Sequence, residues 1–329
     1  MKQARRPVQP SPGLPVHMAP DLHSGRPPCF ALLSALLDAD GSGITGPGAA
    51  GPAGLVDVPA LALAAAGRLG RGDAIVSVAA APLGDVDGAL YHTGAGGWMM
   101  LHHERLDTAE ARFVQAWLLG CYALHGRLHL ARGGAAPAFE CRLPQLYRLA
   151  ELDSLAARAY GFAARLLMPD AVCRDALRGQ VDMEALLAFA GRVRVPVWHA
   201  ARRWIDRTSQ KAALLLDDGA SVHACWLSET AHGAGLHLDI ATASMRLAQR
   251  PSHAQANVAQ AGERLVSLSA WFPDAVAPAV SQQRIDESFI PIAGIGAQAH
   301  RFTLLRLPRE ARAAPRHAWG QHLGAMRSR

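Results

Sequence analysis

A cysteine and a histidine near the middle of the chain have the spacing of a chemical site. Cys121 and His125 stand four residues apart, so in a helix their side chains share one face. A thiolate and an imidazole are both zinc ligands, and a thiolate beside a histidine base is a nucleophile. The alternative is a buried cysteine and a histidine near a helix end. The polar groups that could complete such a site are His102, His103, Glu104 and Glu140.

The sequence contains no complete catalytic signature. The zinc-protease motif His-Glu-x-x-His is absent, and His102-His103-Glu104, the nearest approach to it, lacks the spacing. There is no G-x-S-x-G, and the glycine-rich runs 41–54 and 94–97 lack the Lys-Ser/Thr of a phosphate loop. Cys121 also stands away from the helix N-terminus that would lower a thiol pKa, which argues against a cysteine protease.

Two segments carry a resemblance to a known family. Residues 112–126 read RFVQAWLLGCYALHG and residues 155–169 read LAARAYGFAARLLMP. In their order and separation they resemble the ImmA/IrrE family of bacterial regulatory metallopeptidases. The scaffold residues that match are Arg112, Phe113, Ala116, Gly120, Tyr122, His125, Ala159, Phe162, Ala163, Ala164, Leu166, Leu167, Met168 and Pro169.

The metal-binding positions of that family are lost. By the resemblance, Trp117, Leu118 and Cys121 stand where the family has its His-Glu-x-x-His, and the third ligand falls between Ala156 and Arg158, where there is no carboxylate. Two histidines one turn apart hold the zinc, and the glutamate activates its water. We therefore expect no catalytic residue and no metal cofactor, although the family uses zinc or manganese. Cys121, His125 and His103 are weak candidate metal ligands.

Composition excludes several classes of protein. Half of the 329 residues are hydrophobic, which indicates a folded chain of two or three domains. The net charge is +6, and nearly all of the basic residues are arginine, since lysine occurs only at Lys2 and Lys211. This bias is the pattern of a GC-rich genome, so the basic charge does not indicate nucleic-acid binding. The five cysteines show no C-x-x-C spacing, and no apolar run is long enough for a bilayer. We expect a cytoplasmic protein with reduced thiols and no membrane partner.

The hydrophobic pattern predicts an α+β fold in five regions. These are a flexible region with one short helix (1–54), a zincin-like peptidase domain (55–180), a helix-turn-helix-like segment (181–208), a GAF-like domain (209–308) and a tail (309–329). In the second region we expect a helix at 58–68, strands at 73–81, 88–92 and 98–102, a helix from Asp107 or Thr108, a loop at 127–144, and helices at 145–167 and 170–178.

The segment 182–206 reads as helix, turn, helix. Arg202, Arg203 and Arg207 lie on or just after its second helix and are the candidates for contact with DNA. The preferred interpretation is a packed helical pair that joins two domains. A similar segment follows the peptidase core in the ImmA/IrrE family.

The C-terminal region alternates strands with one helix. We expect strands at 212–216, 222–227, 236–240, 287–292 and 301–307, and a helix at 253–268. An α+β unit in this place resembles the GAF-like domain of the IrrE/PprI branch, which implies a small-molecule ligand.

The resemblance implies a bacterial regulatory protein of transcription. We expect a pseudo-peptidase that binds a repressor-type protein partner, or senses a ligand, in a stress response. Two alternatives stay open: a zinc- or manganese-dependent metalloendopeptidase with displaced ligands that cleaves a repressor, and a DNA-binding regulator.

Overall fold

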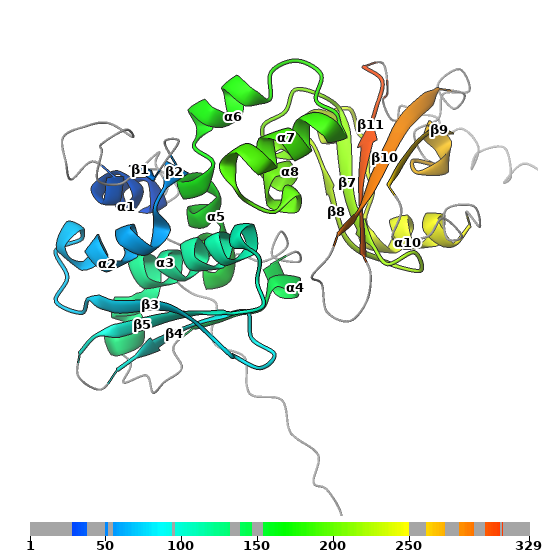
Figure 1. Ribbon diagram of the computed structural model, residues 1–329. Coiled ribbons are helices and arrows are strands. Elements are labelled where there is room, and N and C mark those ends of the chain that lie inside the picture. Colours follow the sequence, from blue (N-terminus) through cyan, green and yellow to red (C-terminus); the bar gives the residue numbers. More distant parts are fainter. Residues whose placement is uncertain are drawn as a thin grey trace, which may run out of the picture.

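The fold is α+β, as the sequence predicts, and contains two large sheets (Figure 1). The computed structural model describes residues 28–37, 50–51, 55–93, 96–131, 139–146, 154–249, 261–273, 283–292, 300–309 and 311. Apart from residues 28–37 and 50–51, the expected flexible region 1–54 lies outside these residues, and so does the expected tail 309–329 apart from residues 309 and 311. Among them, a four-stranded sheet precedes a five-stranded one, and a pair of helices lies between the two sheets.

The N-terminal part is a mixed sheet covered by helices. Its strand order is β3-β5-β4-β6, with β3 parallel to β5 and the other pairs antiparallel. The strands are β3 (Ile75–Ala81), β4 (Gly88–His92), β5 (Trp98–His103) and β6 (Phe139–Cys141). The helices are α1 (Pro28–Leu37), α2 (Val58–Arg68), α3 (Thr108–Ala131), α4 (Leu143–Leu146), α5 (Leu155–Leu167) and α6 (Asp170–Ala176). A two-residue ladder joins β1 (Ala50–Gly51) to β2 (Leu55–Val56).

Helices α3 and α5 cross at a glycine. A Cβ at Gly120 would lie 3.0 Å from the backbone oxygen of Ala159 and 3.0 Å from the ring of Phe162. A side chain at this position would force one of the two helices to shift by a few tenths of an ångström, so glycine suits this close approach. The start of α3 is fixed by Asp107, whose Oδ1 accepts from the amides of Ala109 and Glu110 while Glu110 accepts from the Asp107 amide. This reciprocal capping explains why the helix begins where the sequence predicts.

An ion pair fastens the edge of this sheet to α3. Arg71 donates to both carboxylate oxygens of Asp73 and to the backbone oxygen of Tyr122. The indole of Trp98 donates to Asp73 Oδ2 over 2.9 Å, and Tyr122 Oη donates to the Asp73 backbone oxygen. Partial burial raises the pKa of Asp73, but the hydrogen bonds from Arg71 and Trp98 outweigh it and lower the pKa to about 2.

This shift predicts a loss of stability in acid. Because the folded-state pKa lies below the unfolded value, Asp73 stabilises the fold above about pH 4, and that contribution disappears as the pH falls toward 2. We expect about 1–2 kcal/mol, since the carboxylate is partly open to solvent. Urea unfolding between pH 5 and pH 2 measures it. Asp73→Asn should flatten this part of the profile, whereas Asp175→Asn, on the exposed face of α6, should not.

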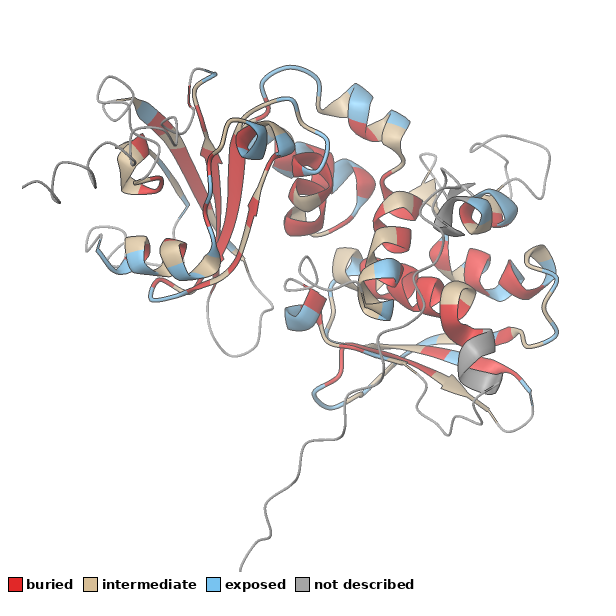
Figure 2. Ribbon diagram, turned by 180° about the vertical axis from the view of Figure 1, so that it is seen from behind, coloured by how far each residue is buried: buried red, intermediate tan, exposed pale blue. Residues whose placement is uncertain are grey.

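The C-terminal part is an antiparallel sheet with helices on both faces. Its strand order is β8-β7-β11-β10-β9. The strands are β7 (Ala212–Asp217), β8 (Val222–Leu227), β9 (Gly262–Ser267), β10 (Arg284–Ile292) and β11 (His300–Arg306). One face packs on α7 (Met183–Val193) and α8 (Val197–Ile205), and the other on α9 (Glu229–Gly233) and α10 (Ile240–Ala248). Figure 2 shows buried residues on the strands and on the helices between the sheets.

The helical pair joins the two parts through one continuous core. His199 of α8 stacks on Phe113 of α3 with ring centroids 3.5 Å apart, and its Nδ1 lies 3.1 Å from Tyr160 Oη of α5. The neighbouring residue of α8, Trp198, packs edge-on against Trp226 of β8 in the C-terminal part. Burial lowers the pKa of His199 to about 3, so its ring is neutral near pH 7. The helix, turn and helix predicted at 182–206 are confirmed as α7 and α8.

Three sequence-based predictions are wrong. The expected loop 127–144 contains the end of α3, β6 and α4, because β6 pairs with β4. The expected strand 236–240 is irregular, since Asp239 accepts from the Thr242 amide and caps α10. The described part of the expected helix 253–268 is strand β9, paired along β10, followed by a 3-10 turn at Leu268–Ala270.

The helix expected at 145–167 is shorter than predicted in the residues that the structure describes. Helix α5 begins at Leu155, with Ser154 as its cap, and residues 147–153 lie outside the described chain. The division of the chain into five functional regions stays a prediction.

Candidate functional site

The three positions of the degenerate motif are buried in the core of the N-terminal part. Trp117 is 4% exposed, and its indole N–H donates to the backbone oxygen of Ala156 over 3.1 Å. Ala156 lies in the first turn of α5, where the resemblance places the third metal ligand. Leu118 points to the sheet, since a Cβ on Gly88 would lie 3.2 Å from its Cδ1. The side chain of Trp117 therefore spans the space between α3 and the first turn of α5.

Cys121 is buried and its thiol stays protonated. Burial, and to a smaller extent the neighbouring Cys141 thiol of β6, raises its pKa well above the usual range. A metal ligand or nucleophile must be the thiolate. Cys121 in this setting therefore behaves as a small apolar side chain.

His125 is the other half of the pair noted in the sequence. It is 5% exposed, and burial lowers its pKa, with a smaller opposing effect of a hydrogen bond to the Leu155 backbone. Its Nε2 has no hydrogen-bond partner among the described residues. His103, at the end of β5, uses Nδ1 to accept from the Arg105 amide.

The described residues contain no grouping of three or more His, Cys, Asp or Glu side chains that could hold a metal ion. The residues at the motif positions do not fit the family's metal either. Trp117 fills the space between α3 and α5, and its only polar group donates a hydrogen bond to the Ala156 backbone oxygen. The side chain of Leu118 has no polar atom, and the Cys121 thiol is neutral.

The three arginines proposed for DNA contact are held in ion pairs. Arg203 is 6% exposed and donates to Asp170 and to the Met168 backbone oxygen. Arg207 also pairs with Asp170, at 2.9 Å. Arg202 donates to Asp206 and lies over the Trp226 ring. This arrangement favours a packed helical pair that joins two domains over a DNA-recognition helix, because a helix that enters a DNA groove must present unpaired side chains to the bases and phosphates.

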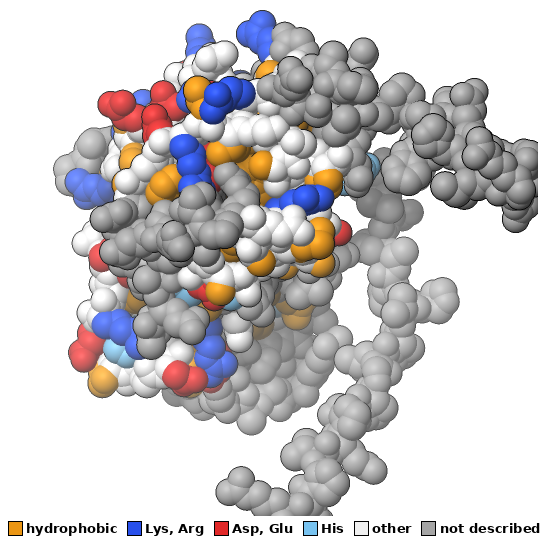
Figure 3. Space-filling view, turned by 90° about the vertical axis from the view of Figure 1, so that its right-hand side faces the viewer, with side chains coloured by type: hydrophobic (Ala, Val, Ile, Leu, Met, Phe, Trp, Pro, Cys, Tyr) orange, Lys and Arg blue, Asp and Glu red, His pale blue; other side chains and the backbone are white. Residues whose placement is uncertain are grey.

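The described surface of the C-terminal part also carries basic and acidic side chains interspersed with one another (Figure 3). Figure 3 shows the side of the molecule on which the five-stranded sheet lies. On the described part of that face, arginines and lysines occur singly between acidic, apolar and neutral groups. No continuous basic stripe of the kind that follows a phosphate backbone is visible there.

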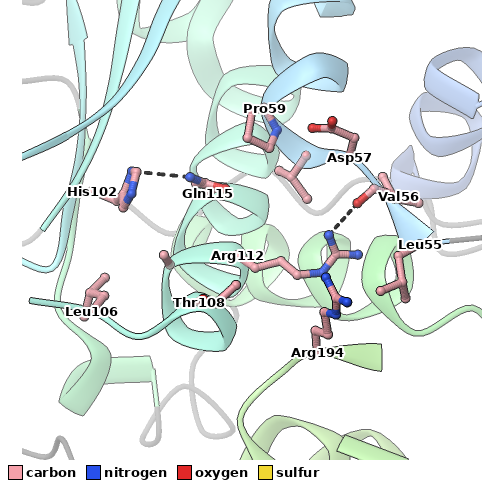
Figure 4. Close-up of a pocket in the computed structure, with 12 residues that line it drawn as sticks. Leu55, Val56, Asp57, Pro59, His102, Leu106, Thr108, Arg112, Gln115 and Arg194 are labelled. Atoms are coloured by element: carbon pink, nitrogen blue, oxygen red, sulfur yellow. Dashed lines mark hydrogen bonds between the residues drawn. The ribbon is translucent and has the colours of Figure 1, made fainter. Parts of the chain in front are cut away.

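Among the described residues, two pockets beside the helices of the core have no motif in the sequence that predicts them. The first, about 440 Å³, lies between the start of α2, the first turns of α3 and the α7–α8 turn (Figure 4). The second, about 320 Å³, lies between α5, α8 and β8, and includes Trp226 and Arg202. Each pocket combines residues distant in sequence, which is why motif reading did not find it.

Comparison with known proteins leaves the family open. No protein-family model matches the chain, and no curated protein matches it. Among solved structures, it is similar to a Mycobacterium tuberculosis transcriptional regulator, with 15% identity and a TM-score of 0.47, over 84% of this chain and 75% of that one. Similarity at this level carries no argument about activity. No described helix is both long and apolar enough to cross a bilayer.

Proposed function

We propose that this protein is a regulator related to the ImmA/IrrE family that binds a repressor-type protein partner and does not cleave it. The observation that carries the proposal is the position of Trp117. Its side chain occupies the space between α3 and α5, and its indole donates to Ala156, in the segment where the resemblance expects the third ligand.

Cleavage of a peptide bond by a metallopeptidase needs an activated water molecule. Peptide hydrolysis by this family requires a metal to lower the pKa of a bound water and a carboxylate to accept its proton. Leu118 stands at the place of that carboxylate and offers no acceptor. Filling a former polar site with apolar side chains removes a desolvation cost and leaves a well-packed core. Such a core can preserve an outer binding surface without the chemistry beneath it.

The metal content of the purified, untagged protein is the first test. After dialysis with excess Zn²⁺ or Mn²⁺, elemental mass spectrometry should find well below one metal per chain. His125→Ala serves as the matched variant, because the unpartnered Nε2 of His125 is the best remaining nitrogen ligand. Stoichiometric metal that this variant loses would instead support the metalloendopeptidase with displaced ligands.

The fate of a partner is the second test. The protein is mixed with DNA-binding repressors encoded beside its gene, in the presence of Zn²⁺ or Mn²⁺, and the mixture is analysed by size exclusion and intact mass. We expect co-elution with a full-length repressor. Metal-dependent fragments of the repressor would contradict the proposal.

A ligand of the C-terminal sheet and direct contact with DNA are less favoured alternatives. The ion pairs of Arg202, Arg203 and Arg207 argue for weak DNA binding at most. A duplex-binding titration at two salt concentrations measures it, since phosphate contacts give a steep salt dependence.

A further inference from the structure

The pocket between α2, α3 and the α7–α8 turn has two cationic side chains at one end. Arg112 of α3 and Arg194 of the turn place their guanidinium groups next to each other (Figure 4). Asp57 is the one acidic residue among the lining residues that the structure describes, and its Oδ1 already accepts from the Ala60 amide at the start of α2. The pocket therefore has an excess of positive charge.

Arg112 is not satisfied by its protein partners. Nη1 donates to the Val56 backbone oxygen, whereas Nε and Nη2 are buried and have no hydrogen-bond partner among the described residues. Burial, and then the like charge of Arg194, lowers the pKa of Arg112, and Asp57 opposes this only in part. A half-buried guanidinium with two buried, unpartnered N–H groups beside a second cation is unfavourable unless an anion lies close to both.

Arg194 is held toward the pocket by an unusual backbone conformation. It has φ 52° and ψ 58°, the left-handed region, and no other described residue except glycine has a positive φ. Its amide donates to the Ala190 and Gly191 oxygens and ends α7. Glycine or asparagine is the usual residue at this position. An exposed arginine here gains nothing for the helix end, but its side chain reaches the pocket.

The remainder of the pocket is apolar with a polar far end. The apolar lining consists of Leu55, Val56, Val58, Pro59, Leu106 and Ala111. His102 lies at the end away from the arginines in Figure 4, with its Nδ1 3.3 Å from Gln115 Nε2. Burial lowers the pKa of His102, so it adds no charge near pH 7. The volume of about 440 Å³ suits a small organic molecule.

We propose that this pocket binds a small organic anion whose carboxylate or phosphate group lies between Arg112 and Arg194 and whose apolar part contacts Leu55, Val56 and Leu106. Guanidinium groups pair with both kinds of oxyanion through charge-assisted hydrogen bonds. The ligand would bridge α3 to the α7–α8 turn, and so would fix the helical pair against the N-terminal part. The pocket can take such a ligand whether the protein cleaves a repressor or binds it intact.

Hexanoate and hexyl phosphate are suitable probes, and hexanamide is the neutral control. Isothermal titration calorimetry on the full chain should show binding of at least one anion that weakens with added NaCl, and the probe that binds tells which head group the site takes. Hexanamide should bind at least about tenfold more weakly, because it lacks the charge-assisted hydrogen bonds.

The decisive variant is Arg194→Gly. Glycine accepts the left-handed backbone more readily than arginine, so the fold should be kept while the guanidinium is lost. We expect binding of the anion to fall about tenfold or more. Arg192→Gln, two residues away and outside the pocket lining, is the matched control and should bind as the unchanged protein does. Absence of binding by both anions, equal binding of hexanamide, or unchanged binding in Arg194→Gly would each overturn the proposal.

Discussion

Replacement of Trp117 by alanine is expected to lower the free energy of unfolding by about 3–5 kcal/mol. The indole is 4% exposed and lies between α3 and α5, where the two helices approach closely at Gly120. Because the backbones of α3 and α5 are already in contact at Gly120, the two helices cannot move closer together to fill the space that the indole leaves. The variant therefore keeps a cavity. Urea unfolding followed by circular dichroism measures the change.

Two further variants separate the contributions of Trp117. Trp117→Phe keeps an aromatic ring in the space but loses the hydrogen bond to the Ala156 backbone oxygen. Loss of this hydrogen bond should lower the free energy of unfolding by about 1 kcal/mol, in addition to a small loss of packing. Leu187→Ala, on the exposed side of α7, should change stability by less than about 0.5 kcal/mol. An unchanged urea midpoint in Trp117→Ala would show that the indole does not fill a space in the core.

Replacement of Asp217 by alanine should cost a similar amount, about 3–5 kcal/mol, for an electrostatic reason. Asp217 and Arg301 are directly opposite each other on β7 and β11, with side chains 1% and 0% exposed. Arg301 Nη2 donates to Asp217 Oδ1 over 2.7 Å, and the Gly219 amide donates to the same oxygen. The variant leaves a fully buried guanidinium without its carboxylate. Thermal and urea unfolding measure the loss.

The pair as a whole need not be a large stabiliser. Burial raises the pKa of Asp217, and Arg301 offsets this only in part, so both charges carry a desolvation cost. The double variant Asp217→Leu with Arg301→Met should therefore lose less stability than Asp217→Ala alone. Asp286→Ala breaks a more exposed pair with Arg306 on the same sheet and should cost at most about 1 kcal/mol. Equal losses for Asp217→Ala and Asp286→Ala would contradict the argument.

Local sequence was sufficient for most helices. Asp182 accepts from the Ala185 amide and begins α7, and Met168-Pro169 ends α5, both as the sequence predicts. Caps and proline act within one or two helical turns, so their effect can be read from neighbouring residues. The α+β class and the three strands before α3 follow from hydrophobic periodicity in the same way.

Long-range pairing decided the segments that the sequence misassigned. Residues 262–267 carry a pattern that fits a helix, but they pair along β10, which lies some way further along the chain. Likewise, β6 forms because it pairs with β4, from which it is separated in the sequence by β5 and the whole of α3. Such partners are not visible in a local window, since strand preference depends on the neighbouring strand.

The sequence by itself determined that the motif positions carry no His-Glu-x-x-His, because the presence of ligand atoms depends only on residue type. The tertiary structure alone decided what stands there instead: Trp117 bonded to Ala156, and Arg203 and Arg207 sharing Asp170. It also decided that Arg112 and Arg194, from two different helical segments, face one pocket. The reason is that burial, pairing and charge balance arise from atoms brought together by folding, and no spacing along the chain encodes them.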